Sequence, residues 1–438
     1  MLALGPFLLS GLLISGYEYK DLWRTEKHLD LATGAILGAI AACFIAGSLV
    51  HTLFAKKATP QESDIDYGRL ERLFLLTYVA TVSGYLFWAA VCFTHGVGPA
   101  EVLAILRGDA GASYTIRDLG TTIPGMTTAT QFGMAAAILG AILWTRRRSL
   151  YVGALLLLLI FMSLVRALLW SERLALIEVA IPLLISAFGR RDWSGHPRMR
   201  RLIYIAPVAG CVFLYLYFTA FESVRSWGHY SEAGGSLWYF SWMRLGGYYI
   251  TALNNGALMY KTIGTLPFPY TVFESFWKFP GMSLVLPYND VFSVDPYAYL
   301  DSLKAMANPE FNNPSGIFPY VLDFSPIGAC VFFFAAGWLA TATYAAFRRD
   351  RIAGLLCYPL LYISLLEISR IPYLTASRTL PSWIILFIGI QLIKKRPARW
   401  RASMRRGRDE PRNPRGVMQY HLPVIRPFSG PATYNEKH

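Results

Sequence analysis

Apolar residues gather along the chain in ten runs, most of them close to the roughly 17 to 25 residues that a helix needs to cross a bilayer. The runs lie at about 2–16, 31–54, 73–94, 123–144, 150–168, 174–188, 202–221, 320–346, 353–369 and 379–393. The first is short for a full crossing. The pattern predicts an all-α, polytopic membrane protein with about ten transmembrane helices.

The apolar stretch from 149 to 188 is too long for one transmembrane helix. At 1.5 Å per residue it would extend about 60 Å, twice the thickness of the hydrocarbon core. Its middle, LLWSERLALIEVAIPLL, contains Glu172 and Arg173. Because an ionised side chain is costly inside a bilayer, we expect a turn at 170–172 that brings both residues to the membrane surface.

Lysine and arginine in the connections predict the orientation, because short loops rich in these residues stay in the cytoplasm. The basic clusters are Lys56-Lys57 with Arg69 and Arg72, Arg146 to Arg148, Arg190-Arg191 with Arg198, Arg200 and Arg201, Arg348-Arg349 with Arg351, and Lys394 to Arg408. With ten helices, all of them fall on one side. Both termini are then cytoplasmic, and the turns at 170–172 and 370–378 face outward.

The same assignment divides the chain into four parts. Residues 1–221 form an N-terminal bundle of about seven transmembrane helices, and 320–393 form about three more. Between helices seven and eight, the large extracytoplasmic segment 222–319 is rich in Pro, Gly, Asn and aromatic residues. We expect short amphipathic helices there, on the membrane surface. The basic tail 394–438 is expected to be disordered in the cytoplasm, close to the inner leaflet.

Composition agrees with a membrane protein and changes how the net charge is interpreted. Only 16% of the residues are charged, against about 25% in soluble domains. A net charge of +14 can indicate nucleic-acid binding, but cytoplasmic basic loops explain it here, so we expect no nucleic-acid partner. The sequence shows no metal-ligand cluster or Gly-rich phosphate loop, and we expect neither metal nor cofactor.

Unexpected ionisable residues gather at the predicted outer ends of the helices. The arginines among them are Arg166, Arg173, Arg225, Arg244, Arg370 and Arg378. A guanidinium group has a fixed charge and a planar fork of donors that suits two phosphate oxygens at once. Several of these groups near the bilayer surface fit a lipid-linked phosphate or diphosphate. Glu222 and His229 share a helix face with Arg225 if that helix continues, and they are candidates for a general base.

Simpler interpretations compete for these residues. A single arginine near a helix end is often an interfacial anchor, and neighbouring Glu and Arg can neutralise each other. The aromatic residues of the outer segment, among them Tyr248 and Tyr249, could hold sugar rings or form an interfacial belt. Asp64 and Asp66 imitate a metal-binding Asp-x-Asp motif, but they are predicted to be cytoplasmic, so we discount them.

Four stretches carry a resemblance to a known family. They are WSERLALIEVAIPLL at 170–184, WMRLGGYYITALNNGALM at 242–259, FNNPSGIFPYVLDFSPIGA at 311–329 and LLEISRIPYLTASRTLPSW at 365–383. Together with the predicted topology, they resemble the bacterial oligosaccharide repeat-unit polymerases, the Wzy-type enzymes of O-antigen, capsule and exopolysaccharide synthesis. Many relatives have Gly or Ser before the arginine that Arg173 matches, so Glu172 departs from the family pattern.

The resemblance implies a membrane glycosyltransferase at the outer face of the bacterial inner membrane. It would transfer one polyprenyl-diphosphate-linked glycan onto the non-reducing end of another lipid-linked repeat unit. Because diphosphate is a good leaving group, the protein has mainly to neutralise its charge and align the acceptor hydroxyl, which arginines can do without metal.

By the same resemblance, the diphosphate- or glycan-binding residues are Arg173, Arg244, Arg370 and Arg378. Arg166 and Arg225 join them from the topology alone. The expected partners are the lipid-linked donor and acceptor, membrane lipids, a flippase and chain-length regulator proteins.

Two other functions share some of these features. A glycan ligase uses the same lipid donor, and the sequence separates it poorly from a polymerase. A transporter of lipid-linked glycans would have paired repeats and charges near the midplane of the membrane. Here the charges gather at one predicted face and the large outer segment has no counterpart in the other half, which favours the polymerase.

Overall fold

The computed structural model describes residues 4–55, 65–107, 109, 116, 126–170, 172–189, 197–230, 235–277, 281–293, 295 and 298–395. Within these residues the protein is all-helical and has no strand. The helices belong to one compact unit that ends at Lys394. Nearly all of the predicted tail, from residue 396 onward, lies outside the described residues.

Each predicted apolar run contains a helix. Six helical stretches are long and apolar enough to cross a membrane: α3 (Leu31–Phe54), α4 (Tyr67–Thr94), η1 with α7 (Thr127–Phe132 and Gly133–Arg147), α8 (Leu150–Leu169), α10 (Pro197–Arg225) and α17 (Phe318–Arg348). Four apolar helices are shorter: α1 (Leu4–Leu13), α9 (Leu174–Phe188), α18 (Ile352–Leu366) and α19 (Leu380–Leu392). These helices indicate a membrane-embedded protein.

The stretch from 149 to 188 folds back on itself as predicted. α8 ends at Leu169, α9 begins at Leu174, and the two helices pack against each other. The turn between them carries Glu172 and Arg173, while Ser171 lies outside the described residues. The two charged residues therefore lie at the end of a helical hairpin.

The segment 222–319 differs from the expected set of short surface helices. Short helices do occur: α11 (Trp227–Tyr230), α13 (Glu274–Trp277), α14 (Met282–Val285), α15 (Tyr288–Phe292), α16 (Ala298–Met306) and η3 (Pro309–Phe311). However, α12 (Leu237–Ile263) has 27 residues, and every residue from Thr251 to Met259 is buried. The prediction was wrong for this part because α12 has no long apolar run. Its burial against other helices stabilises it instead.

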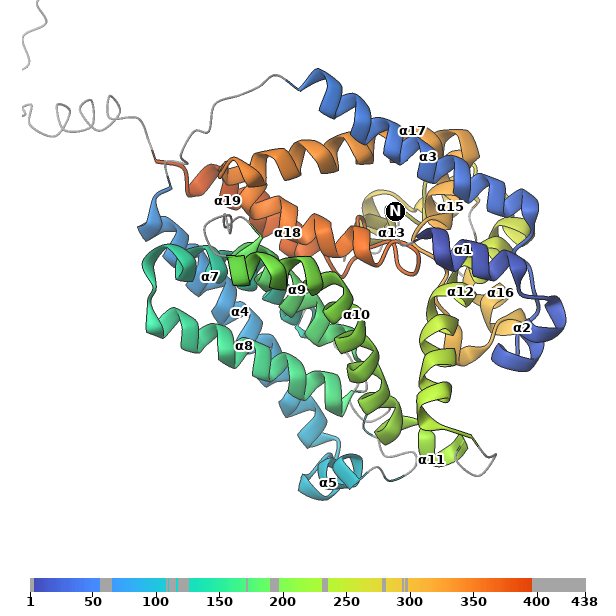
Figure 1. Ribbon diagram of the computed structural model, residues 1–438, viewed down its shortest axis with the longest axis horizontal. Helices are drawn as coiled ribbons and strands as arrows, with labels where there is room; N and C mark the ends of the chain where they lie inside the picture. Colours follow the sequence, from blue (N-terminus) through green and yellow to red (C-terminus); the bar gives the residue numbers. More distant parts are fainter. Residues whose placement is uncertain are drawn as a thin grey trace, which may run out of the picture. The chain divides into compact units, whose positions relative to one another are not determined.

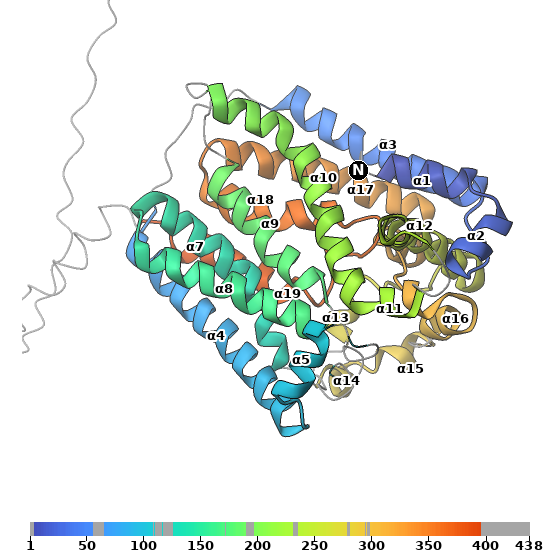
Figure 2. The same cartoon turned by 60° about the horizontal axis from the view of Figure 1, so that its bottom comes forward.

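The helices form two groups, each around its own core. The first group comprises α4, α7, α8, α9, α18 and α19, and its core includes Phe74, Leu139 and Leu356. The second comprises α1, α3, α12 and α17, around Leu253 and Phe333. Figures 1 and 2 both show α4, α7 and α8 on one side and α1 with α3 on the other. The chain passes from the second group to the first twice, between α3 and α4 and between α17 and α18.

Helices α3 and α17 run parallel along much of their length. Contacts between them join Cys43 to Cys330, Gly47 to Phe334, and His51 to Trp338. A Cβ atom at Gly47 would lie 2.0 Å from the Phe334 oxygen, so only glycine permits this close approach. Parallel packing agrees with the predicted topology, in which both helices cross in the same direction.

Basic residues predicted to be cytoplasmic meet at one end of the first group. Their contacts are Arg69 Nη1 to Leu392 O at 3.1 Å, Arg147 Nη1 to Glu71 Oε2 at 3.0 Å, Arg348 Nη1 to Gly189 O at 3.2 Å, and a close ion pair of Arg146 with Asp350. We call this region the basic end. The turns at 170–173 and 367–379 are at the opposite ends of their helices.

Candidate active site

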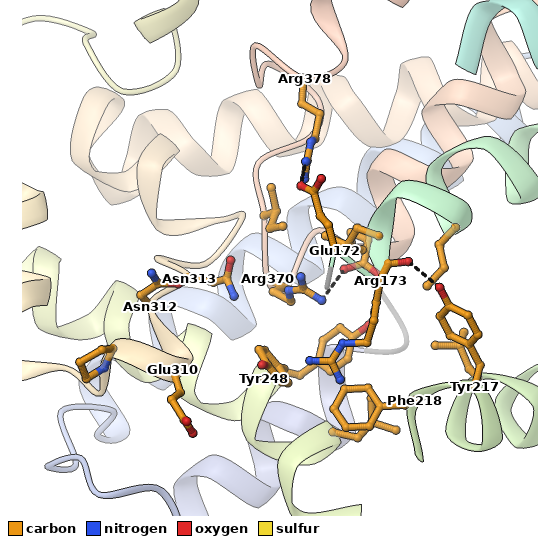
Figure 3. A pocket seen from close by; sticks show the side chains of 18 residues that line it. Glu172, Arg173, Tyr217, Phe218, Tyr248, Glu310, Asn312, Asn313, Arg370 and Arg378 are labelled. Atoms are coloured by element: carbon orange, nitrogen blue, oxygen red, sulfur yellow. Dashed lines mark hydrogen bonds and ion pairs between the residues drawn. The ribbon is translucent and has the colours of Figure 1, made fainter. Parts of the chain in front are cut away.

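A cavity of about 530 Å³ lies between the two groups of helices. It is lined by the α8–α9 turn, α10, α12, the loop that contains η3, and the α18–α19 turn. Ligand pockets commonly measure about 300–1,000 Å³, so the cavity has room for a diphosphate and a sugar ring. Figure 3 shows it from close by, with Arg173, Arg370 and Arg378 directed toward its interior from two different turns.

The cavity brings together most of the arginines predicted from the sequence. Arg173, Arg370 and Arg378 line it directly. Arg244 lies behind this lining and is only 5% exposed. Arg166 and Arg378 both pair with the carboxylate of Glu172. The side chains of Arg225 and His229 lie outside what the structure describes, so their predicted roles stay predictions.

Glu222 is fully buried between two of these arginines. Its Oε1 lies 2.7 Å from Arg173 Nη1, and its Oε2 lies 2.9 Å from Arg244 Nε. The exposed fraction of the residue is 0%. A carboxylate that is fully buried between two guanidinium groups is out of reach of a substrate. This placement favours a role in holding Arg173 and Arg244 over the predicted role of general base.

Glu172 joins a second set of arginines. Its Oε2 accepts a hydrogen bond of 2.9 Å from Arg166 Nη2, and its Oε1 forms a close ion pair with Arg378. Arg378 Nε also lies 3.3 Å from Glu178 of α9. Burial, and then the charge of Arg166, lowers the pKa of Arg378 to about 10, so this residue remains a cation at neutral pH. Glu172 therefore tethers two arginines.

Tyr248 of α12 lies beside both Arg173 and Arg370. The Cζ atom of Arg173 is 4.9 Å from the centre of the Tyr248 ring, and that of Arg370 is 5.5 Å from it. Arg173 also lies 3.9 Å above the ring of Phe218. Each such cation–π contact contributes about 0.5–2 kcal/mol, depending on how far it is desolvated. The ring thus helps to fix two arginines at one wall of the cavity.

Five aromatic residues of α12 fall into two sets. Trp238, Tyr239 and Trp242 are 54%, 62% and 62% exposed, as in an interfacial belt. Tyr248 and Tyr249 line the cavity instead, and the Tyr249 hydroxyl donates to Glu367 Oε1 over 3.1 Å. The two interpretations of these aromatics therefore apply to different residues.

Arg370 is held less tightly than Arg173 and Arg378, the other two arginines that line the cavity. Its Nη1 lies 3.7 Å from Glu367 Oε2, too far for a hydrogen bond. Its Nε is buried and has no hydrogen-bond partner among the described residues. Burial lowers the pKa of Arg370, but Glu367 and the surrounding tyrosines raise it above its ordinary value. Arg370 therefore stays charged, and its Nε–H group is available to donate a hydrogen bond to a ligand.

Among the described residues, five arginines and five glutamates make up the network around the cavity. The arginines are Arg166, Arg173, Arg244, Arg370 and Arg378, and the glutamates are Glu172, Glu178, Glu222, Glu310 and Glu367. Removing a charge from water costs several kcal/mol per ion unless an opposite charge is paired with it. The equal numbers of cations and anions in this network offset that cost. Rigid guanidinium groups in a partly dehydrated cavity are suited to bind a phosphate or carboxylate.

Two buried asparagines of α12 position the loops around the site. Asn254 is 0% exposed; its Oδ1 accepts from the backbone nitrogens of His28 and Leu29. Asn255 donates to the backbone oxygens of Phe311 and Asn313, over 2.5 and 3.0 Å. The Asn-Asn pair within the quoted stretch 242–259 therefore holds one loop on each side of α12.

Sequence reasoning missed several residues of the cavity wall. Glu310, Asn312 and Asn313 line the cavity, and none was among the predicted site residues. The repeated Asn-Asn pairs, at 254–255 and 312–313, were a signal that could have marked both segments. The discounted Asp66 instead caps α4, accepting from the backbone nitrogens of Gly68 and Arg69.

Comparisons with models of known protein families, with curated proteins and with solved structures find no match to this chain. Among the described residues, no group of three or more His, Cys, Asp or Glu side chains could hold a metal ion. The class that fold and site define is therefore a membrane-embedded helical protein with an arginine-lined cavity.

Proposed function

We propose that this protein is a membrane glycosyltransferase that polymerises polyprenyl-diphosphate-linked oligosaccharide repeat units into a surface polysaccharide. The product would be an O-antigen, a capsule or an exopolysaccharide, made at the outer face of the bacterial inner membrane. The observation that carries the proposal is the convergence of Arg173, Arg370 and Arg378 on one cavity at the ends of apolar helices.

The positions of these arginines suit an anionic lipid head group. A carrier lipid keeps its diphosphate at the membrane surface, which is the depth where the α8–α9 and α18–α19 turns would lie. Arg173 uses Nη1 to bind Glu222, and Arg370 has a buried donor without a partner in the described part of the chain. Both can add hydrogen bonds to phosphate oxygens without leaving their carboxylates.

The chemistry needs little else from the protein. An acceptor hydroxyl attacks the anomeric carbon of the donor, the new glycosidic bond forms, and the bond from that carbon to the diphosphate oxygen breaks. The arginines would stabilise the charge that develops on the departing polyprenyl diphosphate. The hydroxyl proton passes to a base, for which Glu172 and Glu310 are more accessible than Glu222. Their side chains are 27% and 30% exposed, against 0% for Glu222.

The proposal includes ten membrane crossings with the basic end in the cytoplasm. Support comes from the contacts that Arg69, Arg146, Arg147 and Arg348 make with neighbouring helix ends. These contacts bring the ends of six helices together. The cavity lies at the opposite ends of α8, α9 and α18. This arrangement supports an extracytoplasmic site.

The test compares surface glycan from cells that lack the gene with cells in which it is restored, by size on a gel. A polymerase predicts that deletion leaves a single repeat unit and that the restored gene returns the long ladder. Long polymer stranded on the carrier lipid would instead indicate a ligase. Glycan precursor trapped inside the cell would indicate a transporter.

The variant Arg173→Lys tests the site within the same cells. It keeps the charge but loses the planar fork, so we expect the long ladder to be lost while the amount of protein in the membrane stays normal. A ladder of wild-type length would overturn the role given to Arg173. Arg351→Lys, at the basic end, is the matched control and should leave the ladder unchanged.

A further inference from the structure

One wall of the cavity differs chemically from the arginine-bearing turns. It is formed by the loop 308–316, from which Glu310, Asn312 and Asn313 line the cavity. Figure 3 shows Asn312 and Asn313 to one side, Arg173 to the other, and Arg370 between them. The cavity therefore presents neutral amides on one wall and cations on another.

The backbone of this loop is fixed at several points. Asn255 binds the oxygens of Phe311 and Asn313, and Asn308 Nδ2 donates to Trp23 O over 2.8 Å. A Cβ atom at Gly316 would lie 2.2 Å from the Ile368 oxygen, so the loop packs directly against the α18–α19 turn. The loop is thereby held in register with the turn that carries the cavity arginines.

The side chains of Asn312 and Asn313 take no part in this anchoring. Neither amide group forms a hydrogen bond within the described residues, and Asn312 is exposed. Each amide offers two N–H donors and one oxygen acceptor to the cavity. The two adjacent amides line the cavity on a fixed backbone and do not stabilise the loop, so both can bind a ligand.

Amide groups of this kind match the hydroxyls of a sugar better than they match a phosphate. A hydroxyl both donates and accepts, and so does a carboxamide, whereas a phosphate oxygen only accepts. Glu310 on the same loop adds a carboxylate, a hydrogen-bond acceptor whose charge is balanced by Arg244 Nη1 at 2.7 Å.

We propose that Asn312 and Asn313 form a carbohydrate subsite, which binds neighbouring hydroxyls of a neutral sugar while the arginines bind the diphosphate. This inference rests on the proposed function and adds to it the part of the substrate that each wall recognises. The two walls should therefore respond separately to substitution.

The experiment measures two ligands by saturation-transfer NMR on the full-length protein in lipid nanodiscs. The first probe is the oligosaccharide repeat unit released by mild acid from the carrier lipid of the same cells. The second is farnesyl diphosphate, a short isoprenoid diphosphate. The variants are Asn312→Ala with Asn313→Ala, Arg370→Gln, and the control Asn289→Ala on the exposed surface of α15.

We expect the double asparagine variant to lose oligosaccharide binding at least about tenfold, while its farnesyl diphosphate binding stays within about twofold of wild type. Arg370→Gln should show the reverse, and Asn289→Ala should match wild type for both probes. The inference is overturned if wild type binds no oligosaccharide. It is equally overturned if the double variant binds oligosaccharide normally, or loses both ligands together.

This outcome is independent of polymerisation. If the glycan ladder identifies a ligase or a transporter, the proposed function fails, but the NMR result still decides whether the amides bind sugar. If the ladder identifies a polymerase and the amides bind no sugar, only the carbohydrate subsite is wrong. Circular dichroism of each variant confirms that it is folded as the wild type is.

Discussion

The basic end and the cavity end are both rich in arginine, but they hold it in different environments. At the basic end, the side chains of Arg147 and Glu71 are 47% and 34% exposed. At the cavity end, those of Arg173 and Glu222 are 11% and 0% exposed, and Arg244 behind them is 6% exposed. The residue types and pair distances are similar, and only the access to water differs.

The difference separates arginines in exposed pairs from arginines that can bind a ligand. Exposed pairs contribute about 0–1 kcal/mol because water screens the charges. Buried pairs cost so much to dehydrate that they persist only with full compensation. An arginine count therefore marks both ends equally, whereas burial and pairing single out the cavity end.

The largest expected effect is on stability, from Glu222→Gln. The substitution removes the charge between Arg173 and Arg244. It leaves buried Arg173 without a counterion among the described residues and Arg244 with Glu310 alone, and breaking a buried pair in this way costs about 3–5 kcal/mol. We expect a clear fall in the thermal unfolding midpoint in detergent and less protein in the membrane. Glu71→Gln, its counterpart at the basic end, should cost less than about 1 kcal/mol. Equal losses from the two variants would contradict the comparison.

A smaller effect is expected from Arg370→Gln, this time on ligand binding. The substitution removes the donor that lacks a partner, and a hydrogen bond to a charged group contributes about 1.5–3 kcal/mol. The affinity for farnesyl diphosphate should fall about tenfold to a hundredfold, measured by titration in nanodiscs. Unchanged affinity would show that Arg370 does not bind diphosphate. Arg351→Gln at the basic end serves as the control.

Substitution of Tyr248 should weaken ligand binding less than Arg370→Gln does, and the effect should depend on the aromatic ring. Tyr248→Leu removes the aromatic face beside Arg173 and Arg370, so we expect the affinity for farnesyl diphosphate to fall about threefold to tenfold. Tyr248→Phe keeps the ring and should lose less. If Phe and Leu weaken binding equally, the ring does not position the arginines. Tyr320→Leu, buried in α17 and stacked on Phe332, controls for loss of packing.

The smallest effect is expected from a substitution at the basic end. Arg147→Gln breaks only the exposed pair with Glu71, so the glycan ladder and the thermal midpoint should stay within error of wild type. The measurement is the same gel as for the deletion strain. A shortened ladder would mean that the basic end takes part in the reaction, and the contrast between the two ends would then fail.

The helices were largely predictable, because a run of apolar residues is both a helix former and a membrane segment. The turn at 170–172 followed from length and from the cost of burying Glu172 and Arg173. Helix α12 escaped prediction because Gly246, Gly247, Asn254 and Asn255 interrupt its apolar pattern. Its stability comes from burial against helices that are distant in the sequence.

The candidate site was predictable in part. The sequence marked Arg173, Arg244, Arg370 and Arg378 by the contrast between charge and an apolar context. It could not distinguish Glu222 as a buried counterion from Glu222 as a base, because both fit the same spacing with Arg225. The loop 308–316 carried no charge pattern beyond Glu310, so its place in the cavity wall was not foreseen.

By itself, the sequence determined where the apolar helices lie, where the stretch from 149 to 188 turns, and which charges lie next to apolar segments. These properties depend on neighbours within a few residues and on the length of each run. Only the tertiary structure decided which charges share a cavity, since Arg173 and Arg370 are almost 200 residues apart and meet through the packing of separate helices. Burial and pairing arise from that packing, and they give identical arginines different roles.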